Sequence, residues 1–365
     1  MHVETEQRIN HLQYHKERND CRYAYVEKMF GHDVVDYAAS YVDLSDPRTA
    51  ILSTADILNI ELMNGKTTHA LVNLKRINDI SNPNQFLSLV NQKLASGGYF
   101  ICCGETSYSR TRRVLNKYPR LIVYPYYLID FTVKRIFPKM FLTRKITLLL
   151  TRGINRVMSL CEIMGRLVAC GFEITDYRPI GYTTYFICKK IKDPEQSRID
   201  NSGLFIKLKR VGKDGKLINY YKFRTMHPYA EYVQDYVYVN NRFEAGCKFK
   251  NDFRITSWGR FLRKLWLDEQ PMWINWLKRQ IKLVGVRPLS LQYFQLYPQA
   301  LQERRVKYLP GLIPPFYADL PKTLEEVIAS EIKYLDAYEK HPLITDVRYF
   351  LMAVYNILVK RARSA

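Results

Sequence analysis

Two adjacent carboxylates, Asp268 and Glu269, lie inside Lys250–Pro288, a block that is otherwise crowded with arginine, lysine and tryptophan. An Asp-Glu pair taken alone is usually a helix cap or half of a surface ion pair. Here five cations stand close to the pair in the sequence, namely Arg254, Arg260, Arg263, Lys264 and Arg287. Cations at this density are rarely assembled only to balance two acids, so the block predicts chemistry on an anionic substrate.

Phosphoryl transfer through an acyl phosphate is the chemistry that suits this pair. A carboxylate attacks phosphorus only when the repulsion between the two anions is neutralised by a divalent metal and by guanidinium groups on the phosphate oxygens. Adjacent acids can divide this work, because one attacks in line while the other holds Mg²⁺, an ion that prefers carboxylate and phosphate oxygens. The pair therefore predicts a phosphoryl-transfer site that uses Mg²⁺.

The elements that position the acids can be read from helix signals. Thr256 or Ser257 is expected to cap a helix over Gly259–Leu267, and Asp268 to cap a second helix over Glu269–Lys278. Both carboxylates would then stand at a helix N-terminus. Backbone N–H groups there favour the ionised form of an acid and a nearby phosphate.

A β-hairpin is predicted upstream, over Leu204–Met226, with Lys213-Asp-Gly215 as its turn. It would bring four basic side chains near one another: Lys209, Arg210, Lys222 and Arg224. Two interpretations stay open. The charges either discourage aggregation of exposed edge strands or bind a diphosphate.

The first half of the chain alternates strands and helices. The predicted strands are Ala50–Thr54, Ala70–Leu74 and Gly98–Cys103, the predicted helices are Asn84–Leu94 and Asn155–Cys170, and a closing hairpin is predicted over Gly171–Lys190. This order indicates an open α/β layer and resembles the second half of a class I methyltransferase domain. A cofactor-binding domain of that kind needs a Gly-rich turn after its first strand, but residues 1–70 contain only Gly31 and Gly65. We therefore expect a degenerate, non-catalytic domain.

Composition sets the domain limits and the compartment. The 365 residues are enough for about two domains, and a polar, breaker-rich stretch near Ile191–Gly203 predicts domains at 1–192 and 203–365 with a linker at 193–202. The net charge of +21 predicts binding to phosphate on a nucleotide, a nucleic acid or an anionic lipid. The seven cysteines lack metal-ligand spacing and are typical of reduced core thiols in the cytosol.

Membrane signals are confined to two segments. The N-terminus lacks the features of a signal peptide, and no apolar run approaches the roughly 18 to 20 residues of a spanning helix. The insertion Arg120–Leu150 mixes aromatics with cations, and Leu343–Lys360 places apolar residues at helical spacing before a basic end. Each segment is expected either to lie on a bilayer surface or to pack on the protein's own core.

Several motifs occur in a recognisable order and spacing. They are Lys209-Arg-Val-Gly-Lys-Asp-Gly215, Tyr221-Lys-Phe-Arg-Thr-Met226, Asp252-Phe-Arg-Ile-Thr-Ser-Trp-Gly-Arg-Phe-Leu-Arg263, Leu267-Asp-Glu-Gln-Pro271, Leu283-Val-Gly-Val-Arg-Pro288 and Pro310-Gly311. On these motifs, residues 203–312 resemble the bacterial sugar transferases, monotopic polyprenyl-phosphate phosphoglycosyl transferases that start capsule, exopolysaccharide and O-antigen assembly. The resemblance implies an α+β domain with a β-hairpin and several helices, following the open, degenerate Rossmann-like α/β domain.

The resemblance also implies a reaction, the transfer of a phospho-sugar from a UDP-sugar to undecaprenyl phosphate with release of UMP. Asp268 would be the nucleophile and Glu269 the Mg²⁺ ligand. The implied substrate-binding residues are Arg263, Arg287 and Lys222 on phosphate oxygens, Arg224 and Arg254 shaping the pocket, and Lys209 and Arg210 on the hairpin. The implied location is the inner, cytoplasmic face of the cell membrane, while assembly into a homo-oligomer stays open.

One departure from the family weakens the expected contact with lipid. The family's hydrophobic re-entrant helix precedes its first hairpin, but Thr183–Lys192 occupies that position here and is expected to be a strand. Two other functions therefore stay open: a non-catalytic assembly or regulatory partner in polysaccharide synthesis, and nucleic-acid binding through the basic, Tyr-rich surface. Joint retention of the two acids with Arg263 and Arg287 favours the enzyme, because clustered buried charges are destabilising unless something uses them.

Overall fold

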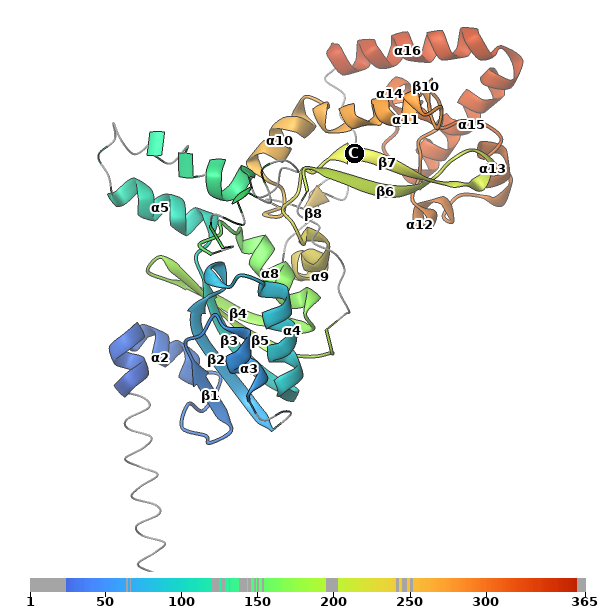
Figure 1. Cartoon of the computed structure of the whole chain (residues 1–365). Coiled ribbons are helices and arrows are strands. Elements are labelled where there is room, and N and C mark those ends of the chain that lie inside the picture. The colour runs from blue at the N-terminus through green and yellow to red at the C-terminus, as the bar shows by residue number, and fades with distance from the viewer. Residues whose placement is uncertain are drawn as a thin grey trace, which may run out of the picture. The chain divides into compact units, whose positions relative to one another are not determined.

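The chain divides into two units in the computed structural model (Figure 1), and each is described by itself. The first comprises Met1–Ser202 with His227–Tyr236, and the second Gly203–Met226 with Val237–Ala365. The structure describes residues 24–63, 65, 67–117, 119, 125–126, 129–130, 132–137, 143, 146–147, 149, 151–152, 154–194, 203–240, 243–244, 248–249 and 252–359. Residues 195–202 of the predicted linker and most of the insertion Arg120–Leu150 lie outside these residues.

A five-stranded sheet forms the centre of the first unit. Its strands are β1 (Thr49–Leu52), β2 (Thr68–Arg76), β3 (Leu94–Gly104), β4 (Phe172–Ile180) and β5 (Thr183–Lys190), in the spatial order β1-β2-β3-β5-β4. The first three are parallel, and β5 runs antiparallel to both of its neighbours. The predicted α/β fold and its closing hairpin are confirmed.

Helices bury apolar residues against this sheet. They are α2 (His32–Ala39), α3 (Ile57–Glu61), α4 (Pro83–Lys93), α5 (Ser107–Lys117) and α8 (Leu160–Ala169). Phe86, Phe100 and Phe172 are fully buried between the layers. The helix predicted from Asn155 starts only at Leu160, because Asn155 is left-handed (φ 57°) and the Ser159 side chain caps α8 by accepting from Glu162 N.

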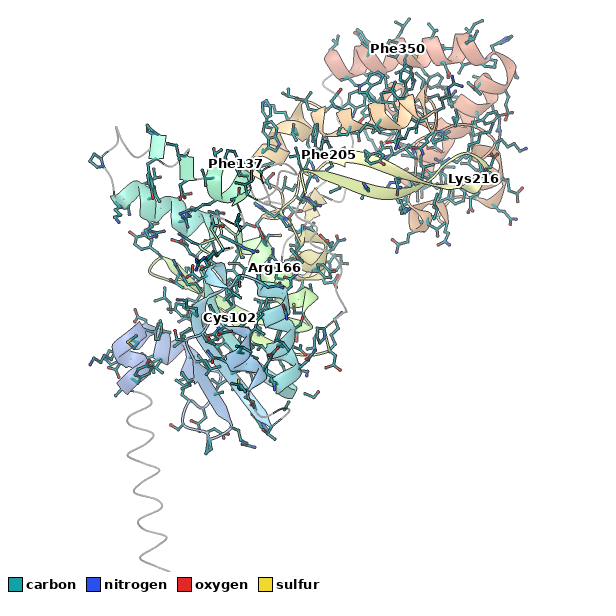
Figure 2. All side chains as sticks on the ribbon, viewed as in Figure 1. Cys102, Phe137, Arg166, Phe205, Lys216 and Phe350 are labelled. Carbon is teal, nitrogen blue, oxygen red and sulfur yellow. The ribbon has the colours of Figure 1, made fainter. Side chains whose placement is uncertain are left out.

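The cysteines that the structure describes are buried thiols, as the sequence predicts. They are Cys102, Cys103, Cys161, Cys170 and Cys188, and Cys102 lies within the sheet (Figure 2). Burial raises the pKa of the Cys103 thiol to about 12, which keeps it protonated and unreactive. Cys21 and Cys247 lie outside the described residues.

Residues 227–236 belong to the first unit, although the sequence places them in the second domain. Tyr229 lies against Gly165 of α8 so closely that a Cβ atom on this glycine would be 2.3 Å from the Tyr229 carbonyl oxygen. The buried Tyr229 hydroxyl accepts hydrogen bonds from Asn84 Nδ2 (2.6 Å) and Arg166 Nη1 (3.3 Å). The segment is therefore an internal part of the α/β unit.

A β-hairpin opens the second unit. Strands β6 (Phe205–Val211) and β7 (Leu217–Phe223) pair antiparallel across the turn Lys213–Gly215, where Asp214 (φ 56°) and Gly215 (φ 71°) are left-handed. The predicted hairpin is confirmed. In its register Leu208 faces Tyr220, and both pack on the core of the unit.

Helices and a two-stranded parallel sheet complete the second unit, and the first of these helices begins at the end of the 227–236 segment of the first unit. They are α9 (Gln234–Asn240), β8 (Phe243–Glu244), β9 (Lys248–Phe249), α10 (Ser257–Lys264), the 3₁₀ helix η6 (Leu267–Met272), α11 (Trp273–Leu277), β10 (Lys282–Val284), α12 (Leu291–Phe294), α13 (Gln299–Arg305), β11 (Gly311–Ile313), α14 (Phe316–Asp319), α15 (Leu324–Lys340) and α16 (Pro342–Leu358). Strands β10 and β11 are the parallel pair, and β8 pairs antiparallel with β9. Met272, Tyr334 and Leu335 lie in the buried core of the second unit.

The last helix, α16, packs with one side only. Tyr349 and Ala353 are buried, and Asn356 Nδ2 donates to the carbonyl oxygens of Tyr317 (3.0 Å) and Ala318 (2.8 Å). Phe350 of α16 is labelled in Figure 2 and is partly buried against the core. Among the helices that the structure describes, none is both long and apolar enough to span a bilayer.

Candidate active site

Asp268 and Glu269 lie in the first turn of η6, which the chain enters through a left-handed Trp266 (φ 58°). The predicted α-helix over Glu269–Lys278 is wrong: η6 is a 3₁₀ helix and the α-helix α11 starts only at Trp273. A proline in the first turn of a helix costs no hydrogen bond, so Pro271 alone does not exclude the predicted helix. The left-handed Trp266 starts η6 before Asp268, so the acids and Pro271 all lie inside a 3₁₀ helix. Trp266 rather than Asp268 precedes the first turn, so Asp268 does not cap a helix.

The helix before the acids, α10, is fixed to the end of the hairpin. Thr256 caps it as predicted, and its side chain accepts from Gly259 N at 2.7 Å. Thr256 also donates from both its backbone N and its hydroxyl to the Thr225 carbonyl oxygen, at 3.0 Å each. At the far end of α10, Arg263 Nε donates to the Thr225 hydroxyl at 2.9 Å. The hairpin end therefore orients Arg263.

Both oxygens of Glu269 are engaged by protein groups. Oε1 forms an ion pair with Lys222 Nζ on β7, and Oε2 accepts from Trp266 Nε1 at 2.7 Å. These contacts fix the carboxylate of Glu269 between η6 and the hairpin. Lys222, which the sequence predicts to hold a phosphate oxygen, pairs with Glu269 here.

Asp268 lacks such partners. Among the described residues, no side chain donates a hydrogen bond to its half-buried carboxylate. Burial raises the pKa of this carboxyl and the neighbouring Glu269 raises it further, while Lys222 and Arg263 act in the opposite direction. Within the described residues, the Asp268 oxygens are thus not occupied by side-chain hydrogen bonds and lie near two cations. A carboxylate that attacks phosphorus requires this arrangement.

Tyr220 is a site residue that sequence reasoning missed. It lies on β7 and is 5% exposed. Burial raises the pKa of its hydroxyl and Glu269 raises it further, whereas Arg287 and Arg210 lower it. Tyr220 is therefore close to the acids and to two arginines, and the only sequence signal for it was its place beside the Tyr221–Met226 motif.

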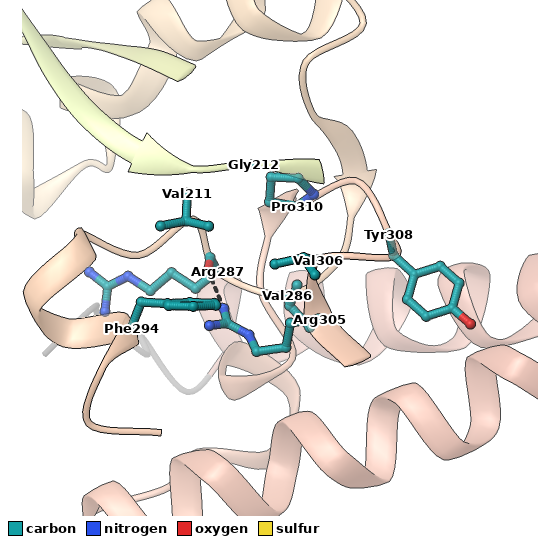
Figure 3. Close-up of a pocket in the computed structure, with 9 residues that line it drawn as sticks. All are labelled: Val211, Gly212, Val286, Arg287, Phe294, Arg305, Val306, Tyr308 and Pro310. Atoms are coloured by element: carbon teal, nitrogen blue, oxygen red, sulfur yellow. Dashed lines mark hydrogen bonds between the residues drawn. The ribbon is translucent and has the colours of Figure 1, made fainter. Parts of the chain in front are cut away.

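The Arg287 loop is held at three of its carbonyl groups. Val286 O accepts from Gly311 N (2.9 Å), Arg287 O accepts from Arg305 Nη2 (2.5 Å), and Leu289 O accepts from Val211 N (2.9 Å). Figure 3 shows the bond from Arg305 beside a small cavity. The two strands that frame this loop touch at Gly285 and Gly311, where a Cβ atom on Gly311 would lie 2.1 Å from Gly285 N. Arg287 is therefore presented by a rigid loop.

Other predicted residues are placed less directly. The Arg254 guanidinium is buried and bidentate on Asp252, with Nε and Nη2 at 2.9 and 2.7 Å from the carboxylate oxygens. Arg224 Nε donates to Gly203 O at 2.7 Å. Lys209 and Arg210 are consecutive on β6, so they point to opposite faces of the hairpin, and only Arg210 shares a face with Lys222. The structure therefore separates Lys209 from the cations near the acids.

The acids can supply part of a magnesium site. No group of three or more His, Cys, Asp or Glu side chains able to hold a metal occurs within the part of the chain that the structure describes. Mg²⁺ is commonly bound through one or two carboxylates together with substrate phosphates. Glu269, the predicted Mg²⁺ ligand, can supply one carboxylate in that mode, with a diphosphate as the source of the remaining ligands.

Comparison with known families gives a match over the same region. Residues 196–360 match the family model of the bacterial sugar transferases. All the motifs described above, from Lys209 to Gly311, fall inside this range. The match therefore covers the part of the chain that contains Asp268 and Glu269.

Curated relatives match parts of the chain. The galactosyl transferase CpsE of Streptococcus agalactiae is 29% identical over 45% of this chain and 36% of its own length. An undecaprenyl-phosphate galactose phosphotransferase of Salmonella typhimurium is 42% identical over 24% of this chain and 20% of its own. A UDP-glucose:undecaprenyl-phosphate glucose-1-phosphate transferase of Klebsiella pneumoniae is 35% identical over 28% and 20%. The chain thus spans between a fifth and about a third of the length of these relatives.

The first unit has only a weak counterpart among solved structures. A SAM-dependent methyltransferase of Thermotoga maritima covers 35% of this chain and 59% of its own, with 13% identity and a TM-score of 0.21. A superposition of this quality adds nothing to the sheet topology. The predicted likeness of the first unit to methyltransferases therefore has only weak structural support.

Proposed function

We propose that this chain, whose C-terminal region belongs to the bacterial sugar transferase family, transfers a phospho-sugar from a UDP-sugar to undecaprenyl phosphate and releases UMP. Such a step starts the assembly of a capsule, exopolysaccharide or O-antigen. The observation that carries the proposal is the asymmetry of the two acids. Glu269 is fixed by Lys222 and Trp266, while the Asp268 carboxylate lies near two cations and receives no side-chain hydrogen bond from the residues that the structure describes.

Asp268 acts as the nucleophile in a two-step exchange. An oxygen of its carboxylate bonds to the phosphorus that carries the sugar, and the bond from this phosphorus to UMP breaks with its electron pair leaving on UMP. An oxygen of undecaprenyl phosphate then attacks the same phosphorus, and the bond to Asp268 breaks and restores the carboxylate. Each step exchanges one phosphorus–oxygen bond for another, so neither needs an oxidant or a reductant.

The cations lower the repulsion between the nucleophile and the diphosphate. Arg263 is held by Thr225 and acts electrostatically on Asp268. Arg287 stands on its rigid loop near Tyr220 and Arg210. Mg²⁺, held by Glu269 with the phosphates of the substrate, would supply charge neutralisation on the diphosphate. Fixed cations of this kind stabilise the charge that develops in the transition state.

An exposed apolar stripe on α16 supports contact with a lipid surface. Every fourth residue contributes to it, and the exposed fractions are Leu343 82%, Val347 59%, Leu351 61%, Tyr355 56% and Val359 61%. The basic sequence Lys360-Arg-Ala-Arg363 follows directly. We propose that this stripe lies on an anionic bilayer, because apolar residues beside cations match the acyl and headgroup layers of such a surface.

Helices α10 and α11 add a second surface of this type. Trp258, Phe261, Trp273 and Trp276 are each between 43% and 57% exposed. Arg260, Lys264 and Lys278 share these two short segments and are exposed. Tryptophan is enriched where one end of a side chain is apolar and the other is wet, as at a bilayer interface.

The test is UMP release by the full chain. Membranes that contain the protein are incubated with UDP-glucose or UDP-galactose, undecaprenyl phosphate and Mg²⁺, and compared with Asp268→Asn and Asp336→Asn membranes. Asp336 is an exposed carboxylate on α15 that pairs with Arg304, so its loss should leave the rate unchanged. Release that requires lipid and is lost only in Asp268→Asn supports the proposal, and equal release by both variants contradicts it.

A non-catalytic role in a polysaccharide assembly is the second candidate. It is favoured by the ion pair and the hydrogen bond that already occupy both Glu269 oxygens. A chain of this kind would bind UDP-sugar or protein partners without turnover. Binding of UDP-sugar with no UMP release from any donor would select this function.

A further inference from the structure

Two buried charges behind the Arg287 loop have no part in the proposed chemistry. Arg305 lies on α13 and Glu331 on α15, and their side chains are 4% and 2% exposed. Arg305 Nε lies 2.8 Å from Glu331 Oε2. Removing both charges from water costs free energy that their mutual attraction often fails to recover. A pair kept in this position is therefore expected to serve something besides stability.

Arg305 is fixed in one orientation. Its guanidinium lies 4.8 Å from the centre of the Tyr297 ring and 5.9 Å from that of Phe294. From this position its Nη2 donates to the carbonyl oxygen of Arg287 (Figure 3). The planar fork of an arginine holds a carboxylate and a carbonyl group at the same time in a fixed geometry.

Glu331 supports the same contact through Arg305. The Arg287 backbone lowers the pKa of the Glu331 carboxylate, so the two groups lie near each other. Arg305 thus joins the carbonyl group of Arg287 to the Glu331 carboxylate. This contact fixes the backbone from which the Arg287 side chain leaves, and the Arg287 guanidinium lies 5.3 Å from the centre of the Phe316 ring.

We infer that Glu331 and Arg305 are positioning residues that aim the Arg287 guanidinium at the diphosphate of the UDP-sugar. The inference rests on the proposed function, since it takes that substrate as the ligand of Arg287. Neither residue touches the substrate, and both act through the loop. The pair differs from Arg304 and Glu339, which join the same two helices at the surface and make no contact with the Arg287 loop in the residues described.

The charge on Glu331 makes the grip dependent on pH. Burial raises the pKa of Glu331 to about 7, while Arg305, the Arg287 backbone and the Arg287 guanidinium act in the opposite direction. Tyr297 also faces it, and the pKa of Tyr297 is raised by burial and by Glu331. When Glu331 takes up a proton it loses its attraction for Arg305, so the hold of Arg305 on the Arg287 carbonyl group weakens below pH 7.

Stability changes with pH in the opposite sense. Because the pKa of Glu331 is higher in the folded chain than its ordinary value of 4.5, the contribution of this group to folding is full at acid pH. It is lost as the pH rises through about 7. Ligand binding is expected to strengthen over that range, so a purely structural role and a positioning role predict different profiles.

The experiment measures the dissociation constant of UDP-glucose and UDP-galactose by calorimetry between pH 6 and pH 8. UDP-sugars suit this range, because their diphosphate diester keeps its charge throughout. For the wild-type full chain we expect affinity to fall about three- to tenfold from pH 8 to pH 6, following the loss of ionised Glu331. Glu331→Gln is neutral at every pH, so it is expected to bind weakly throughout with a flat profile.

The control is Glu339→Gln, which removes the exposed ion pair between the same helices and is expected to keep the wild-type profile. If Glu331→Gln fails to fold, Arg305→Lys replaces it, with weaker binding at pH 8 expected. A wild-type affinity that does not change between pH 6 and pH 8, or a Glu331→Gln profile like that of the wild type, overturns the inference.

The same series separates this inference from the proposed function. UDP-sugar binding with the expected profile but without UMP release would contradict the transfer reaction and leave the positioning role standing. UMP release together with a wild-type affinity that does not change with pH would support the transfer reaction and contradict the positioning role. Absence of any UDP-sugar binding by the wild-type chain would overturn both.

Discussion

A Cβ atom on Gly259 would lie 1.9 Å from the carbonyl oxygen of Thr225, so the start of α10 and the end of the hairpin meet backbone to backbone. The same Thr225 receives two hydrogen bonds from Thr256 and one from Arg263. One residue of the hairpin therefore sets the position of the helix that carries Arg263. The geometry of the cations near Asp268 depends on this contact.

Gly259→Ala is expected to disrupt the site through this contact. The added methyl group meets backbone rather than a movable side chain, so α10 must shift, at a cost of about 1–3 kcal/mol in the free energy of unfolding. UMP release is expected to fall with it, because Arg263 moves with the helix. Thermal unfolding and UMP release measure the two effects. Gly203→Ala is the control, since its Cβ meets only Phe205 O at 3.7 Å, and equal behaviour of the two variants would contradict the prediction.

Asp268→Asn is expected to raise the unfolding temperature while it reduces UMP release by about a thousandfold or more. Because burial raises the pKa of Asp268 above 3.8 in the folded chain, its contribution to stability is full at acid pH and is lost as the pH rises. The neutral amide escapes that loss at pH 8. Unfolding temperatures of wild type and variant at pH 8 and at pH 5 test this, and a larger gain at pH 5 would contradict it.

Lys222→Met is expected to move the acid limb of the pH–rate profile to higher pH. Lys222 lowers the pKa of Asp268, so its removal leaves the nucleophile protonated over a wider range. The measurement is kcat/KM for UMP release as a function of pH. Lys216→Met, an exposed lysine in the hairpin turn, is the control. A variant whose rate falls equally at every pH would show that Lys222 acts on the substrate alone.

Leu351→Glu is expected to weaken binding to anionic vesicles without changing the unfolding temperature. Leu351 is 61% exposed at the middle of the α16 stripe, so a charge there meets the acyl layer rather than the protein core. Co-sedimentation with phosphatidylglycerol-containing vesicles at low and high salt measures the effect. Leu62→Glu alters a leucine of the first unit that is 82% exposed and serves as the control. Equal sedimentation of both variants would show that α16 does not bind the lipid surface.

Local signals in the sequence were enough to predict the elements that depend on neighbouring residues. The hairpin turn at Lys213–Gly215, the Thr256 cap and the parallel strands of the first unit all follow from neighbouring residues. The helix predicted to start at Asp268 was wrong because Pro271 and the left-handed Trp266 act together there. Either signal alone is compatible with a helix start, so their joint effect was visible only in the structure.

The buried part of the site could not be predicted, for a different reason. Tyr220 becomes a neighbour of Glu269 and Arg287 only when the hairpin packs on η6. Arg305 and Glu331 are 26 residues apart and meet because α13 lies on α15. In the sequence, Arg305 and Glu331 have the pattern of ordinary charges on the surface of a helix. Their burial is a property of tertiary packing, which the spacing of residues within one helix does not contain.

The chain passes between its two units three times, after Ser202, after Met226 and after Tyr236. The second and third crossings enclose Tyr229, which is locked under Gly165 and bonded to Asn84. A module joined by one crossing can be gained, lost or exchanged by a single recombination event in the gene. Here a single break would strand ten residues of one unit inside the coding sequence of the other. One break in the coding sequence therefore cannot separate the two units intact.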